Sequence, residues 1–364
     1  MKIINVVGTR PNFIKIAPLI EEMKKHHEIR QILVHTGQHY DEEMSKFFFD
    51  DLGIPKPDIN LGISSLSGKP QTDKIRVELE KIFRKERPDL VIVVGDVNST
   101  LAAALAAAKC KIKVAHIESG LRSFDMTMPE EINRIRTDKI SDFLFTTEES
   151  ANKNLSNEGI DKKKVFFVGN VMIDSLLRHK EKAKKSKILG KLKLKKNDYC
   201  VLTLHRPSNV DDKKALGYVI DILSELQQKI KIVFPIHPRT MKNLENFKLF
   251  DKVKSKKNII LTEPLGYLDF MSLMSNSKLV LTDSGGIQEE TTVLGVPCIT
   301  MRNNTERPVT IEQGTNILVS TDKAEIIKAA DKLLKGATFK PKIPQFWDGK
   351  ASKRIIEIIL KNFS

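Results

Sequence analysis

Cysteine and long apolar stretches are scarce in this sequence. Its 364 residues include three cysteines, Cys110, Cys200 and Cys298, which stand far apart and form no Cys-x-x-Cys pair. Neither a disulfide framework nor a zinc ribbon is therefore expected. Apolar runs such as residues 90–94 and 101–108 are much shorter than the roughly 18 residues that a membrane-crossing helix needs. We expect a globular chain that does not insert into a membrane.

The start of the sequence also lacks the pattern of a secretory signal. It has one lysine and a short apolar run, but no extended apolar segment followed by a small-residue cleavage site. Residues 2–7 are instead predicted to form a first strand, and we expect the protein to be cytoplasmic.

Acidic residues are fewer than basic ones, with 46 Asp and Glu against 61 Lys and Arg, a formal net charge of +15. Such an excess can indicate a nucleic-acid partner. The densest basic run, residues 180–196, has few aromatic side chains that could stack on bases. Enrichment in Lys and Glu is also common in proteins from hot environments. We therefore expect no nucleic-acid partner.

Short β-branched runs alternate with helical segments along the whole chain. The runs are continuously apolar, as is typical of strands buried on both faces of a parallel sheet. The sequence thus predicts an α/β fold. The expected strands are residues 2–7, 31–35, 90–94, 113–117, 143–146, 165–168, 199–204, 232–236, 259–262, 279–281, 297–301 and 317–319.

The alternation breaks once, between about residues 169 and 198. We interpret this break as the junction of two doubly wound domains, residues 1–168 and 169–350. Ligands of such folds bind beyond the carboxyl ends of the strands, so an inter-domain cleft is the expected site. The residues that follow each strand are therefore the ones to consider.

The turn after the first strand, residues 8–15, resembles a phosphate site. Gly8 allows a tight turn, Pro11 suits the first turn of a helix, and Arg10 and Lys15 could hold an anion beside the free N–H groups. An ordinary βα turn with two solvated cations is the alternative. The segment is not G-x-G-x-x-G, so the dinucleotide fingerprint is missing where it would be expected.

Acidic residues follow the next strands of the first half. Asp96 comes after residues 90–94, Glu118 after 113–117, and Glu130 stands in the first turn of a predicted helix. The alternative is that these carboxylates only cap helices or complement helix dipoles. Carboxylates that gather at one rim have pKa values pushed apart, which suits proton-transfer catalysis.

Histidine and arginine follow two strands of the second half. His205 with Arg206, and His237 with Arg239, could recognise an anionic substrate from the side facing the acidic rim. Metal binding is the alternative, because His35 and His39 have i, i+4 spacing. Their surroundings are turn-like and no adequate ligand set follows, so we expect no metal.

A strand followed by Ser284, Gly285 and Gly286 then leads into a helix. Small residues there bring backbone N–H groups onto a bound phosphate at the helix N-terminus. Glu290 lies farther into this helix, where a carboxylate can accept hydrogen bonds from ribose hydroxyls. The alternative is that it only complements the helix dipole. Arg302 and Arg307 add two cations beyond the next strand.

Taken in order, these segments resemble the non-hydrolysing UDP-N-acetylglucosamine 2-epimerases. The resemblance implies a GT-B-type fold of two Rossmann-like domains, with the nucleotide held mainly by the second and the sugar facing the first. It also implies that a C-terminal helix within residues 351–364 packs back on the first domain. A cytoplasmic homodimer that works without a cofactor, in amino-sugar and polysaccharide biosynthesis, is expected.

The resemblance also assigns roles to individual residues. It places Asp96, Glu118, Glu130 and His205 among the catalytic residues. It gives substrate contacts to Arg10, Lys15, Phe270, Ser284, Gly285, Gly286, Glu290 and Arg307. An aromatic such as Phe270 at helical spacing is otherwise typical of a core. Residues 38–43 differ from the run with which bacterial members bind a second, activating UDP-GlcNAc, so allosteric activation is not implied.

The reaction implied is reversible epimerisation at C2 of UDP-N-acetylglucosamine (UDP-GlcNAc) to UDP-N-acetylmannosamine (UDP-ManNAc), by anti elimination of UDP to 2-acetamidoglucal and re-addition. Three alternatives stay open. A hydrolysing relative would release UDP and free N-acetylmannosamine. A GT-B glycosyltransferase would share the nucleotide site, and a non-enzymatic basic module would explain only the charge.

Overall fold

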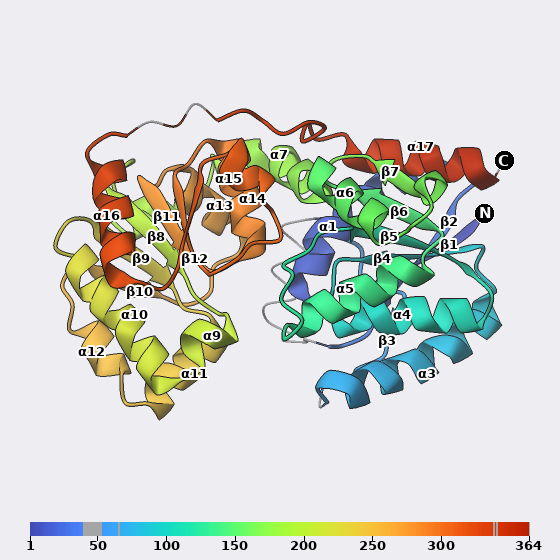
Figure 1. Ribbon diagram of the computed structural model, residues 1–364, viewed down its shortest axis with the longest axis horizontal. Helices are drawn as coiled ribbons and strands as arrows, with labels where there is room; N and C mark the ends of the chain where they lie inside the picture. The colour runs from blue at the N-terminus through green and yellow to red at the C-terminus, as the bar shows by residue number, and fades with distance from the viewer. Residues whose placement is uncertain (39–52, 65, 338, 340, 364) are drawn as a thin grey trace. The chain divides into compact units, whose positions relative to one another are not determined.

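The computed structural model describes residues 1–38, 53–64, 66–337, 339 and 341–363. Their contacts form two compact units, one of Met1–Arg178 with the segment from Gln345 onward and one of His179–Pro344. The division falls inside helix α7 (Val171–Ala183). Each unit is built around its own sheet with helices on both faces (Figure 1).

The first unit contains a seven-stranded sheet in the order β3-β2-β1-β4-β5-β6-β7. Every neighbouring pair in it is parallel. The order runs outward in both directions from β1, as in a doubly wound sheet. The strands are β1 (Lys2–Val7), β2 (Arg30–His35), β3 (Ile59–Asn60), β4 (Leu90–Val94), β5 (Lys113–Ser119), β6 (Phe143–Thr146) and β7 (Val165–Phe167).

Helices cover both faces of this first sheet. On one face α3 buries Ile75, Leu79 and Phe83, which recur at helical spacing and pack with the alanine-rich α4. On the other face α1 contacts the C-terminal helix α17 (Figure 1). The helices are α1 (Arg10–Met23), α3 (Gly68–Glu86), α4 (Asn98–Lys109), α5 (Pro129–Ile140), α6 (Glu149–Asn157), α7 and α17 (Ala351–Phe363), with a 3₁₀ turn at Lys162–Lys164.

Asp174 on α7 caps the C-terminal helix α17. Its carboxylate accepts hydrogen bonds from the backbone N–H groups of Ala351 and Ser352, at 3.1 and 2.7 Å. These are N–H groups of the first helical turn, which have no partner within the helix. The cap therefore anchors the end of the chain to the first unit.

The second unit contains a six-stranded parallel sheet in the order β10-β9-β8-β11-β12-β13. It repeats the doubly wound order of the first sheet, outward from β8. The strands are β8 (Tyr199–Thr203), β9 (Lys231–Pro235), β10 (Ile259–Thr262), β11 (Leu279–Thr282), β12 (Cys298–Met301) and β13 (Asn316–Val319).

Both faces of the second sheet are buried, which explains its continuously apolar strands. Along β8, Cys200 and Leu202 belong to one core cluster, whereas Tyr199 and Val201 belong to another. The helices of this unit are α8 (Ile188–Lys191), α9 (Pro207–Val210), α10 (Lys213–Leu226), α11 (Pro238–Asn246), α12 (Phe250–Lys254), α13 (Tyr267–Ser275), α14 (Gly285–Leu294), α15 (Val309–Glu312) and α16 (Lys323–Leu334). The predicted α/β fold of parallel sheets is confirmed.

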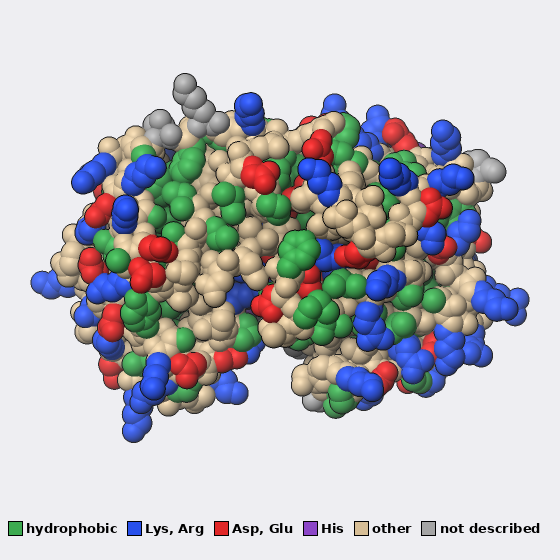
Figure 2. All heavy atoms as spheres, in the orientation of Figure 1, with side chains coloured by type: hydrophobic (Ala, Val, Ile, Leu, Met, Phe, Trp, Pro, Cys, Tyr) green, Lys and Arg blue, Asp and Glu red, His purple; other side chains and the backbone are tan. Residues whose placement is uncertain are grey.

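Charged side chains are spread over the surface drawn in Figure 2, where Lys and Arg lie among Asp and Glu. On this face the basic residues do not gather into one patch. Among the described helices, none is both long and apolar enough to cross a membrane.

Candidate active site

Strands β1, β4 and β5 are neighbours in the first sheet, so the residues that follow them meet at one edge. Lys15 lies on α1 after β1, Asp96 follows β4, and Glu118 is near the end of β5. Because the strands are parallel, their carboxyl ends point the same way. The fold thus brings a cation and two carboxylates together.

Arg134 on α5 joins the two carboxylates. Its Nη2 atom lies 2.5 Å from Asp96 Oδ2 and 3.3 Å from Glu118 Oε1. Lys15 forms a second ion pair with Glu118. The side chains of Arg134 and Glu118 are 1% exposed, whereas that of Asp96 is 24% exposed. Glu118 is therefore enclosed by two buried cations, and Asp96 is the more open carboxylate of the pair.

Glu118 has an unusual backbone. Its φ angle is +68°, in the left-handed region that residues with a Cβ atom rarely adopt. The pairing of β5 with β6 shifts register between Ile117 and Ser119, which marks a bulge at this residue. Strain of this kind is common where a side chain must be aimed at a functional site.

The turn after β1 is held by Asn12. Its Oδ1 atom accepts hydrogen bonds from the N–H groups of Gly8 and Thr9, at 3.2 and 3.1 Å, and its Nδ2 atom donates to the carbonyl of Val94. These bonds fix the turn that leads into α1. Arg10 is the first residue of α1 and is half-buried.

Glu130 is half-buried in the first turn of α5, four residues before Arg134. Residues at i and i+4 lie on the same side of a helix. Glu130 and the arginine that joins Asp96 to Glu118 therefore project from one side of α5.

In the second unit, Asp283 organises the end of β8. This fully buried carboxylate accepts hydrogen bonds from the N–H groups of His205 and Arg206, at 3.0 and 2.9 Å, and lies 2.9 Å from His205 Nδ1. Burial acts to raise the pKa of Asp283, but its hydrogen bonds and the charge of His205 outweigh it and lower that pKa. The ionised Asp283 fixes the position of the His205 ring.

Helix α14 begins at Gly285, directly against Arg307. A Cβ atom on Gly285 would lie 2.6 Å from Arg307 Nη1, so only glycine leaves room for the guanidinium there. The first N–H groups of a helix carry partial positive charge and bind anions. Ser284, Gly285, Gly286 and Arg307 together form a site suited to a phosphate group.

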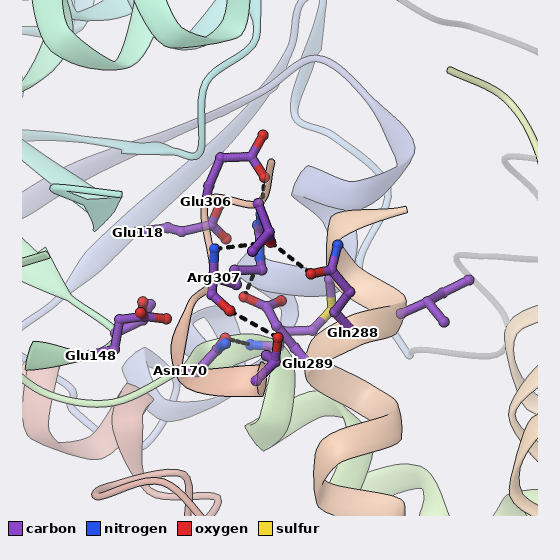
Figure 3. A network of polar contacts seen from close by, with 12 residues as sticks. Glu118, Glu148, Asn170, Gln288, Glu289, Glu306 and Arg307 are labelled. Carbon is purple, nitrogen blue, oxygen red and sulfur yellow. Dashed lines mark hydrogen bonds and ion pairs between the residues drawn. The ribbon is translucent and has the colours of Figure 1, made fainter. Parts of the chain in front are cut away.

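Two carboxylates flank Arg307 (Figure 3). Arg307 Nε donates to Glu289 Oε1 at 2.7 Å, and Nη1 donates to Glu306 Oε2 at 3.3 Å. Glu306 also accepts two hydrogen bonds from Arg302, at 2.8 and 3.0 Å. Burial acts to raise the pKa of Glu306, but Arg302, Arg307 and Arg206 lower it well below its ordinary value. The paired carboxylates hold the Arg307 guanidinium in one orientation.

Glu290 points to Tyr267 on the neighbouring helix α13. The Tyr267 hydroxyl donates a 2.9 Å hydrogen bond to Glu290 Oε1, and both side chains are buried. Burial, and then the negative charge of Glu290, raise the pKa of Tyr267. Phe270 lies one turn beyond Tyr267 and packs partly against the core cluster that includes Leu273.

The structure brings most predicted residues into two groups, one in each unit. Lys15, Asp96 and Glu118 are in direct contact through ion pairs or Arg134, and Gly285 touches Arg307. His39 and the rest of residues 39–43 lie outside the described part of the chain. Within the described part, no group of three or more His, Cys, Asp or Glu side chains is arranged to hold a metal.

Among the residues of these groups that sequence reasoning missed are Arg134, Asp283 and Tyr267. Arg134 had a usable signal, since it stands four residues after Glu130 on a predicted helix. Asp283 directly precedes Ser284 and its glycines. Tyr267 had no signal in the sequence, because its contact with Glu290 joins two separate helices.

The fold and these groups define a class, the two-domain α/β enzymes of GT-B type that act on nucleotide sugars. A family model described as UDP-N-acetylglucosamine 2-epimerase matches residues 21–360. The chain therefore belongs to the UDP-N-acetylglucosamine 2-epimerase family, and the resemblance drawn from its motifs is confirmed at the level of this family.

Individual relatives span nearly the whole chain. UDP-N-acetylglucosamine 2-epimerase of Methanocaldococcus jannaschii is 47% identical over 365 residues, with 99% of each chain covered. Its crystal structure in complex with UDP-GlcNAc and UDP has a TM-score of 0.94 and covers 99% of this chain and 100% of its own. UDP-2,3-diacetamido-2,3-dideoxy-D-glucuronate 2-epimerase of Pseudomonas aeruginosa is 42% identical, covering 99% of this chain and 100% of its own.

Proposed function

We propose that this epimerase interconverts UDP-GlcNAc and UDP-ManNAc without hydrolysing them, through elimination and re-addition of UDP. The observation that carries the proposal is the contact of Arg134 with both Asp96 and Glu118. Arg134 joins these two carboxylates at the end of the first sheet. Asp96 is partly exposed, whereas Glu118 is buried. Glu130 projects from the same side of α5 as Arg134, so a second proton-transfer group is available beside Asp96. Inversion at C2 needs two such groups, because a proton must leave one face of the sugar and arrive at the other.

The hydrogen at C2 of the sugar is hard to remove directly, because no carbonyl group is adjacent to C2. Departure of UDP from C1 makes the sugar oxocarbenium-like and acidifies that hydrogen. A carboxylate takes the proton, the C2–H electrons form the C1–C2 double bond, and the C1–O bond breaks to give 2-acetamidoglucal and UDP. Protonation of C2 on the opposite face and attack of UDP on C1 then complete the epimerisation.

We assign proton transfer to Asp96 and Glu130 and a supporting, coupled role to Glu118. Asp96 is the more exposed partner of Arg134, which suits contact with a substrate. Glu118 is buried between Lys15 and Arg134, which suits a group that stays charged.

The second unit would stabilise the leaving UDP. The N-terminus of α14 and Arg307 offer N–H donors and a cation to the diphosphate, whose negative charge grows as the C1–O bond breaks. Glu290 would accept hydrogen bonds from the ribose hydroxyls, and Phe270 would lie near the uracil. His205, whose ring is oriented by Asp283, is the active-site histidine that we assign to the second unit. Arg10 and Lys15 are the proposed contacts from the first unit.

The proposed reaction is redox-neutral, so it requires no electron acceptor, and we propose that neither metal nor cofactor takes part. We also propose a homodimer in the cytoplasm, with residues 1–168 supplying the carboxylates and residues 169–350 binding UDP. Residues 351–364 complete the first domain in this assignment.

Incubation with UDP-GlcNAc in D₂O, followed by NMR of the products, tests the reaction. We expect a mixture with UDP-ManNAc that carries deuterium at C2, because the carboxylate that holds the C2 proton exchanges it with solvent. The chelator EDTA is expected to leave the rate unchanged. Retention of the C2 hydrogen, or a requirement for added NAD, would contradict the mechanism.

The same products distinguish the rival functions. Free N-acetylmannosamine and UDP would indicate the hydrolysing reaction. Transfer of the sugar to an acceptor would indicate a glycosyltransferase. Turnover of UDP-2,3-diacetamido-2,3-dideoxy-D-glucuronate but not of UDP-GlcNAc would assign the substrate of the P. aeruginosa relative instead.

A further inference from the structure

A buried histidine and aspartate lie beside the carboxylate group without belonging to it. His116 on β5 and Asp138 on α5 are both fully buried, and His116 Nδ1 lies 2.7 Å from Asp138 Oδ1. The other ring nitrogen of His116, Nε2, lies 2.7 Å from the carbonyl oxygen of Gly95. Neither residue has a role in the proposed reaction.

The Gly95 carbonyl fixes a proton on one nitrogen of the His116 ring. A backbone carbonyl can only accept a hydrogen bond, so Nε2 must donate to Gly95. Asp138 also accepts hydrogen bonds from Arg122 Nη2 at 2.7 Å and from the N–H of Gly120 at 3.1 Å, as an ionised carboxylate does. Both of these bonds reach Asp138 Oδ2, so Oδ1 is the atom that pairs with His116 Nδ1.

The charge state of Asp138 agrees with this geometry. Burial acts to raise the pKa of Asp138, but the neighbouring His116 and Arg122 outweigh burial and lower that pKa. Asp138 thus stays ionised in the folded protein.

This ion cluster holds backbone on both sides of the two carboxylates. Gly95 directly precedes Asp96, and Gly120 lies two residues after Glu118. Gly95, Glu118 and Gly120 all have left-handed backbone, with φ of +70°, +68° and +76°. His116 forms a hydrogen bond with the carbonyl of Gly95, and Asp138 accepts one from the N–H of Gly120. One His–Asp pair therefore spans the left-handed ends of β4 and β5.

We propose that His116 and Asp138 are positioning residues, which hold the ends of β4 and β5 so that Asp96 and Glu118 keep the geometry needed for proton transfer. The inference rests on the proposed function. A buried ion cluster contributes less to stability than apolar packing of the same volume. Its advantage is fixed geometry, and a misplacement of about 1 Å at a reacting group can cost 10²-fold in rate.

Two variants test the role, His116→Gln and Asp138→Asn. We expect each to lower kcat about 10²-fold and to leave the Kd for UDP unchanged, because UDP is assigned to the other unit. The kcat of the double variant is expected to be no lower than that of either single variant, because the two residues act as one unit. His35→Gln, which removes another buried histidine of the same sheet, is the matched control and should keep kcat.

A primary isotope effect separates positioning from mere loss of stability. With UDP-GlcNAc deuterated at C2, displaced carboxylates should slow the proton transfer and raise the isotope effect on kcat above that of the unaltered enzyme. Unfolded protein lowers the active fraction but does not change the isotope effect. Variants with normal kcat would overturn the proposal, and so would a fall in kcat that only matches the loss of folded protein.

NMR of the unaltered protein labelled with ¹⁵N-histidine covers the case in which the variants do not fold. His116 Nε2 should carry a proton that exchanges slowly with water, because it donates to the Gly95 carbonyl, and a ring with no proton on Nε2 would overturn the inference. If the unaltered protein makes no UDP-ManNAc, the proposed function fails and this role fails with it. If it is active and both variants keep full kcat, the positioning role alone is wrong.

Discussion

Tyr267 on α13 donates a hydrogen bond of 2.9 Å to the Glu290 carboxylate on α14. The bond orients the acceptor that we assign to the ribose. We predict that Glu290→Ala weakens UDP binding about 10- to 100-fold, because hydrogen bonds to a charged group are worth about 1.5–3 kcal/mol. Calorimetry with UDP and with 2′-deoxy-UDP measures the loss.

The comparison of the two nucleotides makes this prediction specific. The unaltered protein should prefer UDP, and Glu290→Ala should lose most of that preference. Tyr267→Phe should lose part of it, because the carboxylate is less firmly held. Glu245→Ala, at an exposed position of α11, is the control and should bind both nucleotides normally. An undiminished preference in Glu290→Ala would remove the ribose assignment.

The carboxylates of the first unit should affect turnover and not UDP binding. Asp96→Asn and Glu130→Gln are each expected to lower kcat by about 10² to 10⁴, the usual contribution of a general acid or base. The Kd for UDP should change little. Steady-state kinetics and calorimetry give the two quantities. Glu149→Gln, an exposed glutamate in the first turn of α6, serves as the control. A near-normal kcat in either test variant removes that residue from the mechanism.

The strands could be predicted from the sequence because both faces of each sheet are buried. Strands β1, β4 and β6 begin and end at the predicted residues. Strand β5 extends two residues beyond the predicted end at residue 117, because the bulge at Glu118 carries the pairing on to Ser119. Strand β3 was not predicted, since two residues at a sheet edge leave no periodic pattern.

The site could be predicted only in part. Strand ends pointed to Asp96 and Glu118, and the glycines at the start of α14 pointed to the phosphate-type site. The pairing of Arg134 with both carboxylates, and of Arg307 with Glu289 and Glu306, depends on side chains from segments far apart in the sequence. Such contacts follow from tertiary packing and not from local spacing.

Glycine at position 285 is a testable requirement of the phosphate-type site. A Cβ there would lie 2.6 Å from Arg307 Nη1, so Gly285→Ala should displace the guanidinium and weaken UDP binding at least about tenfold. Gly217→Ala is the matched control, because nothing lies within 4 Å of a Cβ at that position inside α10. It should bind UDP normally and raise the free energy of unfolding by about 0.5–1 kcal/mol. Equal UDP affinity in the two variants would show that Arg307 does not need the space.

Stability should depend on pH through His35 at the end of β2. The His35 ring is buried and packs against Phe13, with ring centroids 5.1 Å apart. Burial lowers the pKa of His35 from 6.5 to about 4, despite hydrogen bonds to Asn60 and Gly8 that act to raise it. The unfolded chain takes up a proton near pH 6.5, whereas the folded protein does so only near pH 4. The free energy of unfolding should therefore fall as the pH decreases from 6.5 to 4, by at most about 3 kcal/mol.

Thermal unfolding at pH 7 and pH 5 measures this effect in three proteins. The unaltered protein should lose several degrees in Tm between the two pH values. His35→Gln has no ring to protonate, so its Tm should change less over the same interval, whatever its stability at pH 7. His27→Gln removes an exposed histidine and should behave like the unaltered protein. An equal fall in Tm for all three proteins would assign the pH dependence to groups other than His35.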